Sequence, residues 1–280
     1  MRITPLLLSL FLGLALFVQA ESPSANTTEP SEQITRHAYT HPTPDKVTDY
    51  LLYHPRTDTS PAKHSLLIFL YGAGGSLDLY NIKRPPYAQL RAQLAERGYY
   101  IVVPDLGKFH FMNDEAKKSL DGVVAQIRVQ QEISKERVHV MGTSMGAGSS
   151  LAYAIHRPDL IQSVCAVMPM TDFATWVVEN PSYLERVAKA YGGTYEQVPD
   201  AYDRNSSIRN VDAFANIPVM LIHGNADKIV VYEQSQRLAK SLQDKNYVCK
   251  FYTADKQGHK DEVMRNFQRQ AIEFFDAAVK

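Results

Sequence analysis

The stretch Val138-His-Val-Met-Gly-Thr-Ser-Met-Gly-Ala-Gly148 decides the fold of this chain. Its first residues are largely apolar and predict a strand, and residues 145–156 predict a helix that stops before Arg157-Pro158. The two meet at Gly142-Thr-Ser-Met-Gly146, which matches the pattern G-x-S-x-G. In that setting the chain turns sharply and holds the serine at the tip of the turn, and glycines on either side avoid steric collisions. We therefore expect Ser144 to be presented between a strand and a helix.

Strand and helix patterns alternate along the rest of the chain. Continuous apolar runs, typical of strands covered on both faces, occupy residues 66–71, 99–103 and 219–222, and softer candidates occupy 48–53, 161–167 and 247–252. Apolar residues at helical spacing predict helices at residues 87–97, 114–133, 231–243 and 262–279. This alternation predicts the α/β class, with one mostly parallel central sheet and helices on both faces.

The chain divides into three predicted parts. Met1-Arg2, an apolar run over residues 5–18 and the small residue Ala20 predict a signal peptide at residues 1–20, and hence a secreted or periplasmic protein. The alternative is an uncleaved anchor, but the run is shorter than the roughly 20 residues that a span needs, so we expect no membrane span after cleavage. Residues 21–45 are rich in Ser, Thr, Pro and Glu and predict a polar, solvated leader, and residues 46–280 predict a single domain.

Residues 170–216 form an unusually long connection between two predicted strands. Long connections in compact domains often act as lids or binding loops, so this segment is a possible lid or substrate-binding insertion. The alternative is an ordinary helix with long flanks and with its aromatic side chains packed beneath it. Within the segment, Trp176 is the candidate for a substrate contact.

The charge balance excludes one class of partner. Lys and Arg together number 30, as do Asp and Glu, so the formal net charge is zero. A nucleic-acid binder needs a surplus of cationic side chains, and we expect no nucleic-acid partner here. The balance also gives no electrostatic reason to expect a strongly charged polymer as substrate, although a local patch can hide within a zero sum. The oligomeric state stays open.

A serine hydroxyl is a weak nucleophile at neutral pH and needs a base, which in turn needs an acid to orient it. Asp227 follows the predicted strand at residues 219–222, and His259 follows the last predicted strand. The order Ser144, Asp227, His259 is that of hydrolases in which each of these groups follows a strand. We expect the three residues to form a catalytic triad.

Other acids and histidines lie at related positions. Asp172, after the preceding strand, and Asp255, close to the histidine, are the alternative acids. His110 is at most a substrate contact. His139 and His223 lie within a predicted strand or at its end, which is more typical of core groups than of bases.

The anion that forms during attack needs two backbone N–H donors. The Met145 N–H, directly after the serine, is the first candidate, and the Ala73 N–H, in the glycine-rich run after residues 66–71, is the second. The alternative is a glycine-rich turn with no catalytic role. Tyr71 and Gly72, next to Ala73, are further candidates for substrate contact. Nothing in this scheme requires a metal or an organic cofactor.

With these motifs, residues 46–280 resemble the α/β-hydrolase superfamily of serine hydrolases. Lys46–Pro55 followed by Leu66–Gly75 resembles small secreted esterases of the polyhydroxybutyrate-depolymerase and feruloyl-esterase type. One residue departs from the esterase pattern, because Tyr71 stands where such esterases usually have His.

A second resemblance is to the catalytic domain of prolyl-oligopeptidase-like enzymes. It rests on Tyr191–Thr194 and on Asp203–Ile208 leading into Ile217–Asp227. Those peptidases carry a large propeller domain ahead of the hydrolase unit, whereas this sequence has only the polar leader there. The resemblances imply an enzyme that cleaves a small-molecule or polymer-linked carboxylic ester through an acyl-enzyme. The alternatives are a prolyl-oligopeptidase-like serine peptidase and a non-catalytic hydrolase-fold binding protein.

The same fold places one strand between the strands that carry Cys165 and Cys249. Two strand spacings of about 4.8 Å separate the cysteines by about 10 Å, whereas a disulfide needs Cα atoms within about 7 Å. We therefore expect two free, buried thiols.

Overall fold

The computed structural model describes residues 33–43, 46–57, 64–77 and 86–279. All of these described residues belong to one compact unit. The signal peptide predicted at residues 1–20 lies outside the described residues and stays a prediction. In the described part of the chain, no helix combines the length and the apolar character that a membrane crossing requires.

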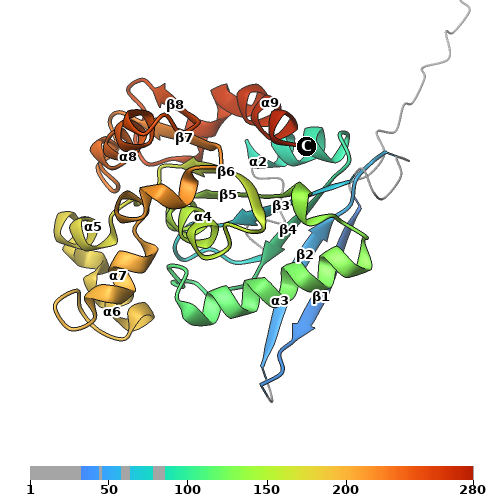
Figure 1. Cartoon of the computed structure of the whole chain (residues 1–280), viewed down its shortest axis with the longest axis horizontal. Helices are drawn as coiled ribbons and strands as arrows, with labels where there is room; N and C mark the ends of the chain where they lie inside the picture. The colour runs from blue at the N-terminus through green and yellow to red at the C-terminus, as the bar shows by residue number, and fades with distance from the viewer. Residues whose placement is uncertain (1–32, 44–45, 58–63, 78–85, 280) are drawn as a thin grey trace, which may run out of the picture. The chain divides into compact units, whose positions relative to one another are not determined.

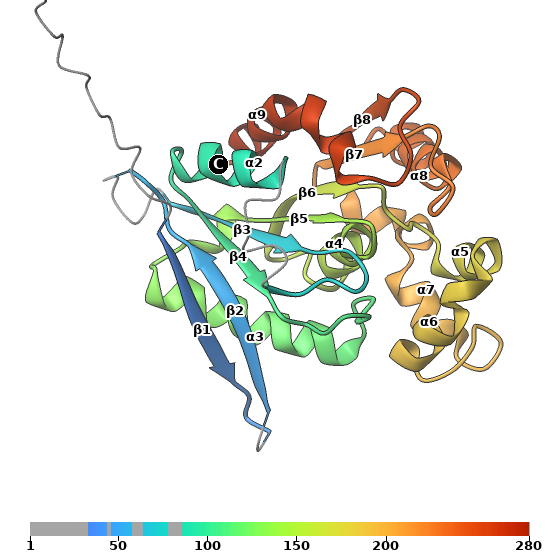
Figure 2. The same cartoon turned by 180° about the vertical axis from the view of Figure 1, so that it is seen from behind.

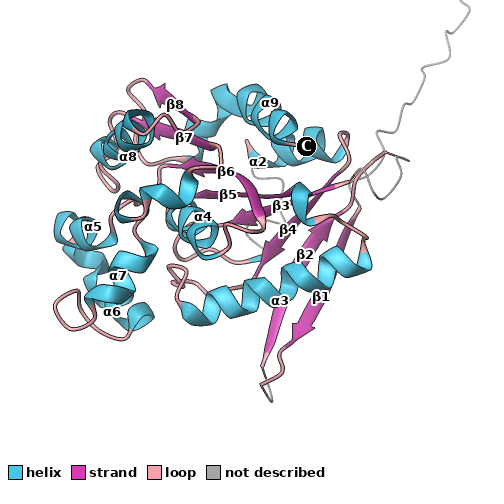
Figure 3. Cartoon of the chain, viewed as in Figure 1, coloured by secondary structure: helices cyan, strands magenta, loops and turns pink. Residues whose placement is uncertain are grey.

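A central sheet runs through the unit, with the strand order β1-β2-β4-β3-β5-β6-β7-β8 (Figures 1 and 3). The strands from β4 along to β8 pair in parallel, and β1 and β2 extend the β4 edge in antiparallel pairs. The prediction of an α/β fold with a mostly parallel sheet is confirmed. The strands are β1 (Ile34–Thr40), β2 (Val47–Tyr53), β3 (Ser65–Leu70), β4 (Tyr99–Pro104), β5 (Val138–Thr143), β6 (Ile161–Val167), β7 (Val219–Gly224) and β8 (Cys249–Ala254).

Helices cover both faces of the sheet (Figures 1 and 2). One face packs against α3 (Asp114–Gln130), α4 (Met145–His156) and α8 (Tyr232–Asp244), and the other against α2 (Tyr87–Ala95) and α9 (Gln268–Ala278). Successive side chains of β3 alternate between the two cores: Leu66 and Ile68 join the first, and Leu67 and Phe69 join the second. Burial on both faces explains why this strand reads as a continuous apolar run.

The predicted polar leader is wrong in its second half. Residues 34–40 form β1, which pairs with β2 along its whole length. The sequence concealed this strand because β1 is an edge strand whose residues are exposed or only half-buried. His41 is buried after β1, and its ring lies 2.8 Å from Thr48 Oγ1. The domain therefore begins about 12 residues before the predicted boundary at residue 46, since β1 starts at Ile34.

The long connection at residues 170–216 is mostly helical. It contains α5 (Phe173–Glu179), α6 (Leu184–Tyr191) and α7 (Pro199–Asn205), joined and followed by short 3₁₀ turns. These helices gather beside α4 at one end of the unit (Figure 1), and α7 packs against α4. Trp176 and Tyr202 are almost fully buried, so the aromatic side chains of the segment build a small core of their own.

Both cysteines are free, as expected. Cys165 on β6 and Cys249 at the start of β8 are separated by β7. Cys165 is fully buried, whereas Cys249 is only half-buried because it lies on the edge strand. Burial raises the pKa of Cys249 to about 11 and that of Cys165 further, so neither thiol ionises readily at neutral pH.

The packing of α4 against the sheet depends on glycine at position 146. A Cβ built on Gly146 would lie 2.0 Å from the carbonyl oxygen of Leu70 on β3, and one on Gly142 would lie 2.2 Å from the Gly146 oxygen. Both contacts are with backbone, which no side-chain rotation can relieve. The first turn of α4 thus touches the end of β3 with no room for a side chain between them.

We expect Gly146→Ala to destabilise the fold by at least about 2 kcal/mol, because the new methyl group must push α4 off β3. Urea unfolding of the purified variant measures this difference. Gly258→Ala is the matched control, since its Cβ would meet only the Ala226 oxygen, at 3.7 Å. Equal stability of the two variants would contradict the close approach.

Candidate active site

Ser144 lies at the tip of the turn between β5 and α4. Its backbone has φ 54° and ψ −121°, a conformation that costs a non-glycine residue about 1–3 kcal/mol. The Ser144 N–H donates to the carbonyl of Val167 on β6 at 2.9 Å, which fixes the turn to the neighbouring strand. The helix begins at Met145 with no side-chain cap, so its first N–H groups and its positive dipole end are left for a ligand.

The structure brings Ser144, His259 and Asp227 together. The Ser144 hydroxyl lies 2.8 Å from His259 Nε2, and His259 Nδ1 lies 2.6 Å from Asp227 Oδ2. Because a carboxylate can only accept, Nδ1 carries the ring proton, and Nε2 is left to accept from the serine. A serine, a base and an orienting acid are thus in hydrogen-bond contact.

Two loops that are distant in the sequence meet to build this contact. Asp227 lies in the loop after β7, and His259 follows β8. The Ala226 N–H donates to the Gln257 carbonyl at 2.9 Å and joins the loops. A Cβ on Gly224 would lie 2.3 Å from the same carbonyl oxygen, so glycine there allows the approach.

The Asp227 carboxylate is held in a buried, hydrogen-bonded position. Its Oδ1 accepts from the N–H groups of Ile229 and Val230, at 2.8 and 3.0 Å. Burial raises the pKa of the Asp227 carboxyl, but the hydrogen bonds from His223 and His259 and the charge of His259 outweigh burial and hold this pKa below its usual range. The acid therefore stays ionised at neutral pH and can stabilise a charged His259.

His223 lies in direct contact with the acid, which the sequence did not reveal. It is fully buried, as expected of a core group, but its Nε2 lies 3.3 Å from Asp227 Oδ2 and 2.9 Å from the Val230 carbonyl. On the other side, its Nδ1 lies 2.7 Å from Ser235 Oγ. The signal for this role was its position four residues before Asp227, at the end of β7.

The two predicted oxyanion donors are available. Within the described residues, neither the Ala73 N–H nor the Met145 N–H donates a hydrogen bond. The turn that carries Ala73 is held by the Gly74 N–H, which donates to the Lys108 carbonyl at 2.8 Å, and by the Gly75 N–H, which donates to the Gly72 carbonyl. Their use as an oxyanion hole stays a prediction that the geometry allows.

A cavity of about 430 Å³ opens in front of Ser144 and His259. The predicted residues Gly72 and Ala73 line it, and the insertion at residues 170–216 contributes Tyr183. The sequence placed Tyr183 in that segment but gave no sign that it reaches the cavity. The further lining residues among those described are Gly74, Gly75, Thr143, Met168, Lys260, Asp261 and Glu262. We call this space the catalytic cavity.

Two predicted substrate contacts, Tyr71 and Trp176, lie outside the lining of the catalytic cavity. Tyr71 is buried, and its hydroxyl donates to Asp105 at 2.9 Å. Trp176 is buried under the insertion, and its indole N–H donates to the Ile229 carbonyl at 2.9 Å. Neither lines the catalytic cavity. The Tyr71 ring packs in the core between the sheet and helices α2 and α9, and the Trp176 ring packs in the core of the insertion.

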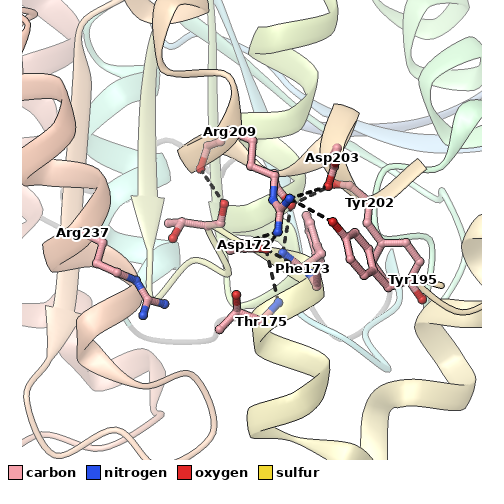
Figure 4. Close-up of polar contacts among 12 residues, drawn as sticks. Asp172, Phe173, Thr175, Tyr195, Tyr202, Asp203, Arg209 and Arg237 are labelled. Atoms are coloured by element: carbon pink, nitrogen blue, oxygen red, sulfur yellow. Dashed lines mark hydrogen bonds and ion pairs between the residues drawn. The ribbon is translucent and has the colours of Figure 1, made fainter. Parts of the chain in front are cut away.

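The alternative acids are engaged elsewhere. Asp172 caps α5 by accepting from the N–H groups of Ala174 and Thr175, and it forms an ion pair with Arg209 at 3.4 Å. Figure 4 shows Arg209 reaching Asp172 and Asp203 together, which ties the start of α5 to α7 and anchors the insertion. The other candidate, Asp255, is exposed and accepts from the Asn225 side chain.

The described residues include no group of three or more His, Cys, Asp or Glu side chains arranged to hold a metal ion.

His110 lines a second cavity rather than the catalytic one. Burial lowers the pKa of His110 to about 3, so its ring is neutral at physiological pH.

The low pKa of Asp227 predicts a stability difference that depends on pH. An ordinary Asp has a pKa of about 3.9, so the native carboxylate stabilises the fold above about pH 4, and this contribution is lost as the pH falls towards the lower folded-state pKa. We expect the difference in unfolding free energy between the wild type and Asp227→Asn to be constant above about pH 5 and to shrink towards about pH 3. Urea titrations across this range measure it, and a difference that does not change with pH would contradict the assignment.

Comparison with known proteins gives the family. Residues 87–280 match the prolyl oligopeptidase family. The chain is 25% identical over 184 residues to the uncharacterized peptidase YtmA of Bacillus subtilis. This match covers 62% of this chain and 68% of YtmA. It is also 26% identical over 212 residues to dipeptidyl peptidase family member 2 of Caenorhabditis elegans, but covers only 24% of that protein.

Solved structures share the fold. A ferulic acid esterase superposes with a TM-score of 0.69 at 15% identity, over 88% of this chain and 99% of that one. Puromycin hydrolase superposes with a TM-score of 0.72 at 15% identity, over 88% of this chain but 39% of that one. These similarities confirm the α/β-hydrolase fold. Since the family match extends over more than half of the sequence, the chain belongs to the prolyl oligopeptidase family of serine hydrolases.

Proposed function

We propose that the protein cleaves a carboxylic ester through an acyl-enzyme intermediate on Ser144. The observation that carries the proposal is the continuous contact from the Ser144 hydroxyl through His259 to Asp227, at 2.8 and 2.6 Å. The ferulic acid esterase, whose length is almost entirely covered by this chain, supports an ester as substrate. No metal or organic cofactor is part of this scheme.

The chemistry follows from the geometry. The Ser144 oxygen attacks the ester carbonyl while His259 Nε2 takes the hydroxyl proton. Asp227, held ionised, stabilises the imidazolium that forms. The carbonyl oxygen becomes an anion, and the N–H groups of Ala73 and Met145 stabilise it, each donor being worth about 10²–10³ in kcat.

Collapse of the tetrahedral intermediate breaks the bond to the alcohol. His259 returns its proton to the alkoxide, and the alcohol leaves while the acyl group stays on Ser144. A water molecule then enters, His259 takes one of its protons, and attack on the acyl carbon releases the acid and restores the Ser144 hydroxyl. The catalytic cavity, with Tyr183 on its wall, is where the substrate groups would lie.

The second candidate is cleavage of a peptide bond. The family match and the peptidase YtmA favour it, and the same residues can perform it. The two reactions differ in the leaving group, because an amine must be protonated before it departs whereas an alcohol leaves more easily.

Replacing Ser144 tests the proposed nucleophile. We expect Ser144→Ala to lower kcat/KM for 4-nitrophenyl acetate by at least about 10⁴-fold, because the base is left without a nucleophile to activate. Ser149→Ala is a matched control on the same helix, since this buried hydroxyl has no hydrogen-bond partner among the described residues. Unchanged turnover by Ser144→Ala would contradict the assignment of Ser144 as the nucleophile.

A panel of substrates separates ester from peptide cleavage. Aryl and methyl esters are compared with peptide anilides that carry the same acyl group, and the released alcohol or aniline is measured. We expect turnover of the esters and at least about 100-fold lower kcat/KM for the anilides, a difference of about 3 kcal/mol in activation free energy. Anilide cleavage at a comparable kcat/KM would establish the peptidase instead.

We also propose that the enzyme acts after export, because residues 1–20 have the pattern of a signal peptide. Mass spectrometry of the protein recovered from outside the cytoplasm should find Glu21 at its amino terminus. An intact Met1 on the exported protein would contradict the cleavage.

A further inference from the structure

A second cavity, of about 570 Å³, lies next to the catalytic cavity. We call it the basic cavity, because Lys46, Lys108, Arg186 and Lys189 line it against only two carboxylates, Asp105 and Glu115. Its walls come from the start of β2, the loop after β4, the first half of α3 and α6. Nothing in the triad chemistry uses this space.

The two cavities share a wall. Gly74 lines the catalytic cavity, and its N–H donates at 2.8 Å to the carbonyl of Lys108, which lines the basic cavity. The Arg186 guanidinium provides a second link: it stacks over Tyr183, which lines the catalytic cavity, at 5.4 Å from the ring centre and over Phe109 at 5.0 Å. A substrate that reaches past Tyr183 therefore meets Arg186 next.

The charges of the basic cavity do not cancel. Lys46 is paired with Glu115 at 2.8 Å, so these two side chains offset each other. Among the described residues, Lys108 and Lys189 form no ion pair, and Arg186 pairs with no carboxylate. The remaining carboxylate, Asp105, already accepts from the Tyr71 hydroxyl and the Gly107 N–H. Three cations thus face one acid, and the lining keeps a surplus of positive charge.

The cavity also has apolar walls. Phe109, which is 37% exposed, lines the cavity together with Leu106, Ala116 and Ala190. His110 adds no charge there because burial lowers its pKa to about 3. Two of the cations, Arg186 and Lys189, lie on α6, and Lys108 lies on the loop after β4. Cations beside apolar walls suit a carboxylate at the end of an apolar group.

We propose that the basic cavity binds a carboxylate on the part of the substrate that lies away from the scissile bond. The enzyme then prefers esters of substrates that carry a free carboxylate over uncharged ones. Lys108, Arg186 and Lys189 hold the carboxylate by charge-assisted contacts, and the apolar walls cover the chain that links it to the ester. This inference rests on the proposed function and names the substrate class that the site selects.

Matched substrates test it. The 4-nitrophenyl monoesters of dicarboxylic acids from adipic to sebacic acid are compared with the esters of the same length that end in a carboxamide. We expect kcat/KM to be about tenfold higher for the carboxylate at the best length, mainly through KM, and the preference to fall with added salt. A second pair, phenyl acetates with a carboxymethyl or a carbamoylmethyl group on the ring, places the charge on the leaving group instead.

Charge-removing variants locate the effect. In the double variant Lys108→Gln with Lys189→Gln, which keeps only Arg186 of the three cations, the ratio of kcat/KM for the charged and uncharged esters should fall several-fold towards one. Lys250→Gln, an exposed lysine on β8 that lines neither cavity, is the control and should keep the wild-type ratio. The inference is overturned if the wild type shows no preference in either substrate pair, or if the double variant and the control keep the same ratio.

A binding measurement tests the carboxylate site independently of the proposed esterase function. If the wild type turns over no ester, the proposed esterase function fails, and the basic cavity is tested by titrating the Ser144→Ala protein calorimetrically with adipate. Binding of adipate, but not of adipamide, that is weakened several-fold when Lys108→Gln and Lys189→Gln are added supports the carboxylate site. The absence of adipate binding overturns it.

Discussion

The contact between Gly146 and the backbone of β3 is the constraint on which the active site depends. The Leu70 carbonyl lies where a side chain at position 146 would begin, so α4 rests directly on the sheet. Ser144 lies directly before this contact, between β5 and α4, and its backbone adopts φ 54°. In this conformation the Ser144 hydroxyl lies beyond the carboxyl ends of the strands, next to the first N–H groups of α4.

The rest of the site meets Ser144 at that edge of the sheet. Parallel strands deliver their following loops to one edge, which is why Asp227 after β7 and His259 after β8 reach the same point. The buried His223 and two backbone N–H groups hold the Asp227 carboxylate in place. Although burial raises the pKa of the acid, the hydrogen bonds from His223 and His259 and the charge of His259 hold this pKa below its usual range, so the carboxylate and the imidazolium stabilise each other.

The parts that sequence reasoning predicted are those governed by local chemistry. The turn at residues 142–146 can be recognised from the glycines on either side of its serine. Strands such as β3 and β7 are mostly apolar because both of their faces are buried. Ser144 and Asp227 were predicted because each follows such a strand, and His259 because it follows the last predicted strand, β8, which is an edge strand. The half-buried edge strand β1 left no comparable pattern, and Tyr183 could not be distinguished from Trp176 because only packing decides which aromatic ring faces the cavity. The basic cavity could not be predicted from the net charge, which is zero for the whole chain, because its lysines and its arginine come from segments that are far apart in the sequence.

The central claim is that His259 activates Ser144 for attack on a carbonyl, and covalent labelling tests it most directly. Treatment with a fluorophosphonate, followed by digestion and mass spectrometry, should find one adduct, on the peptide that contains Ser144, and His259→Gln should abolish the fast phase of labelling. The absence of any adduct, as in a binding protein that only shares the fold, or an adduct on a different serine, would contradict the account.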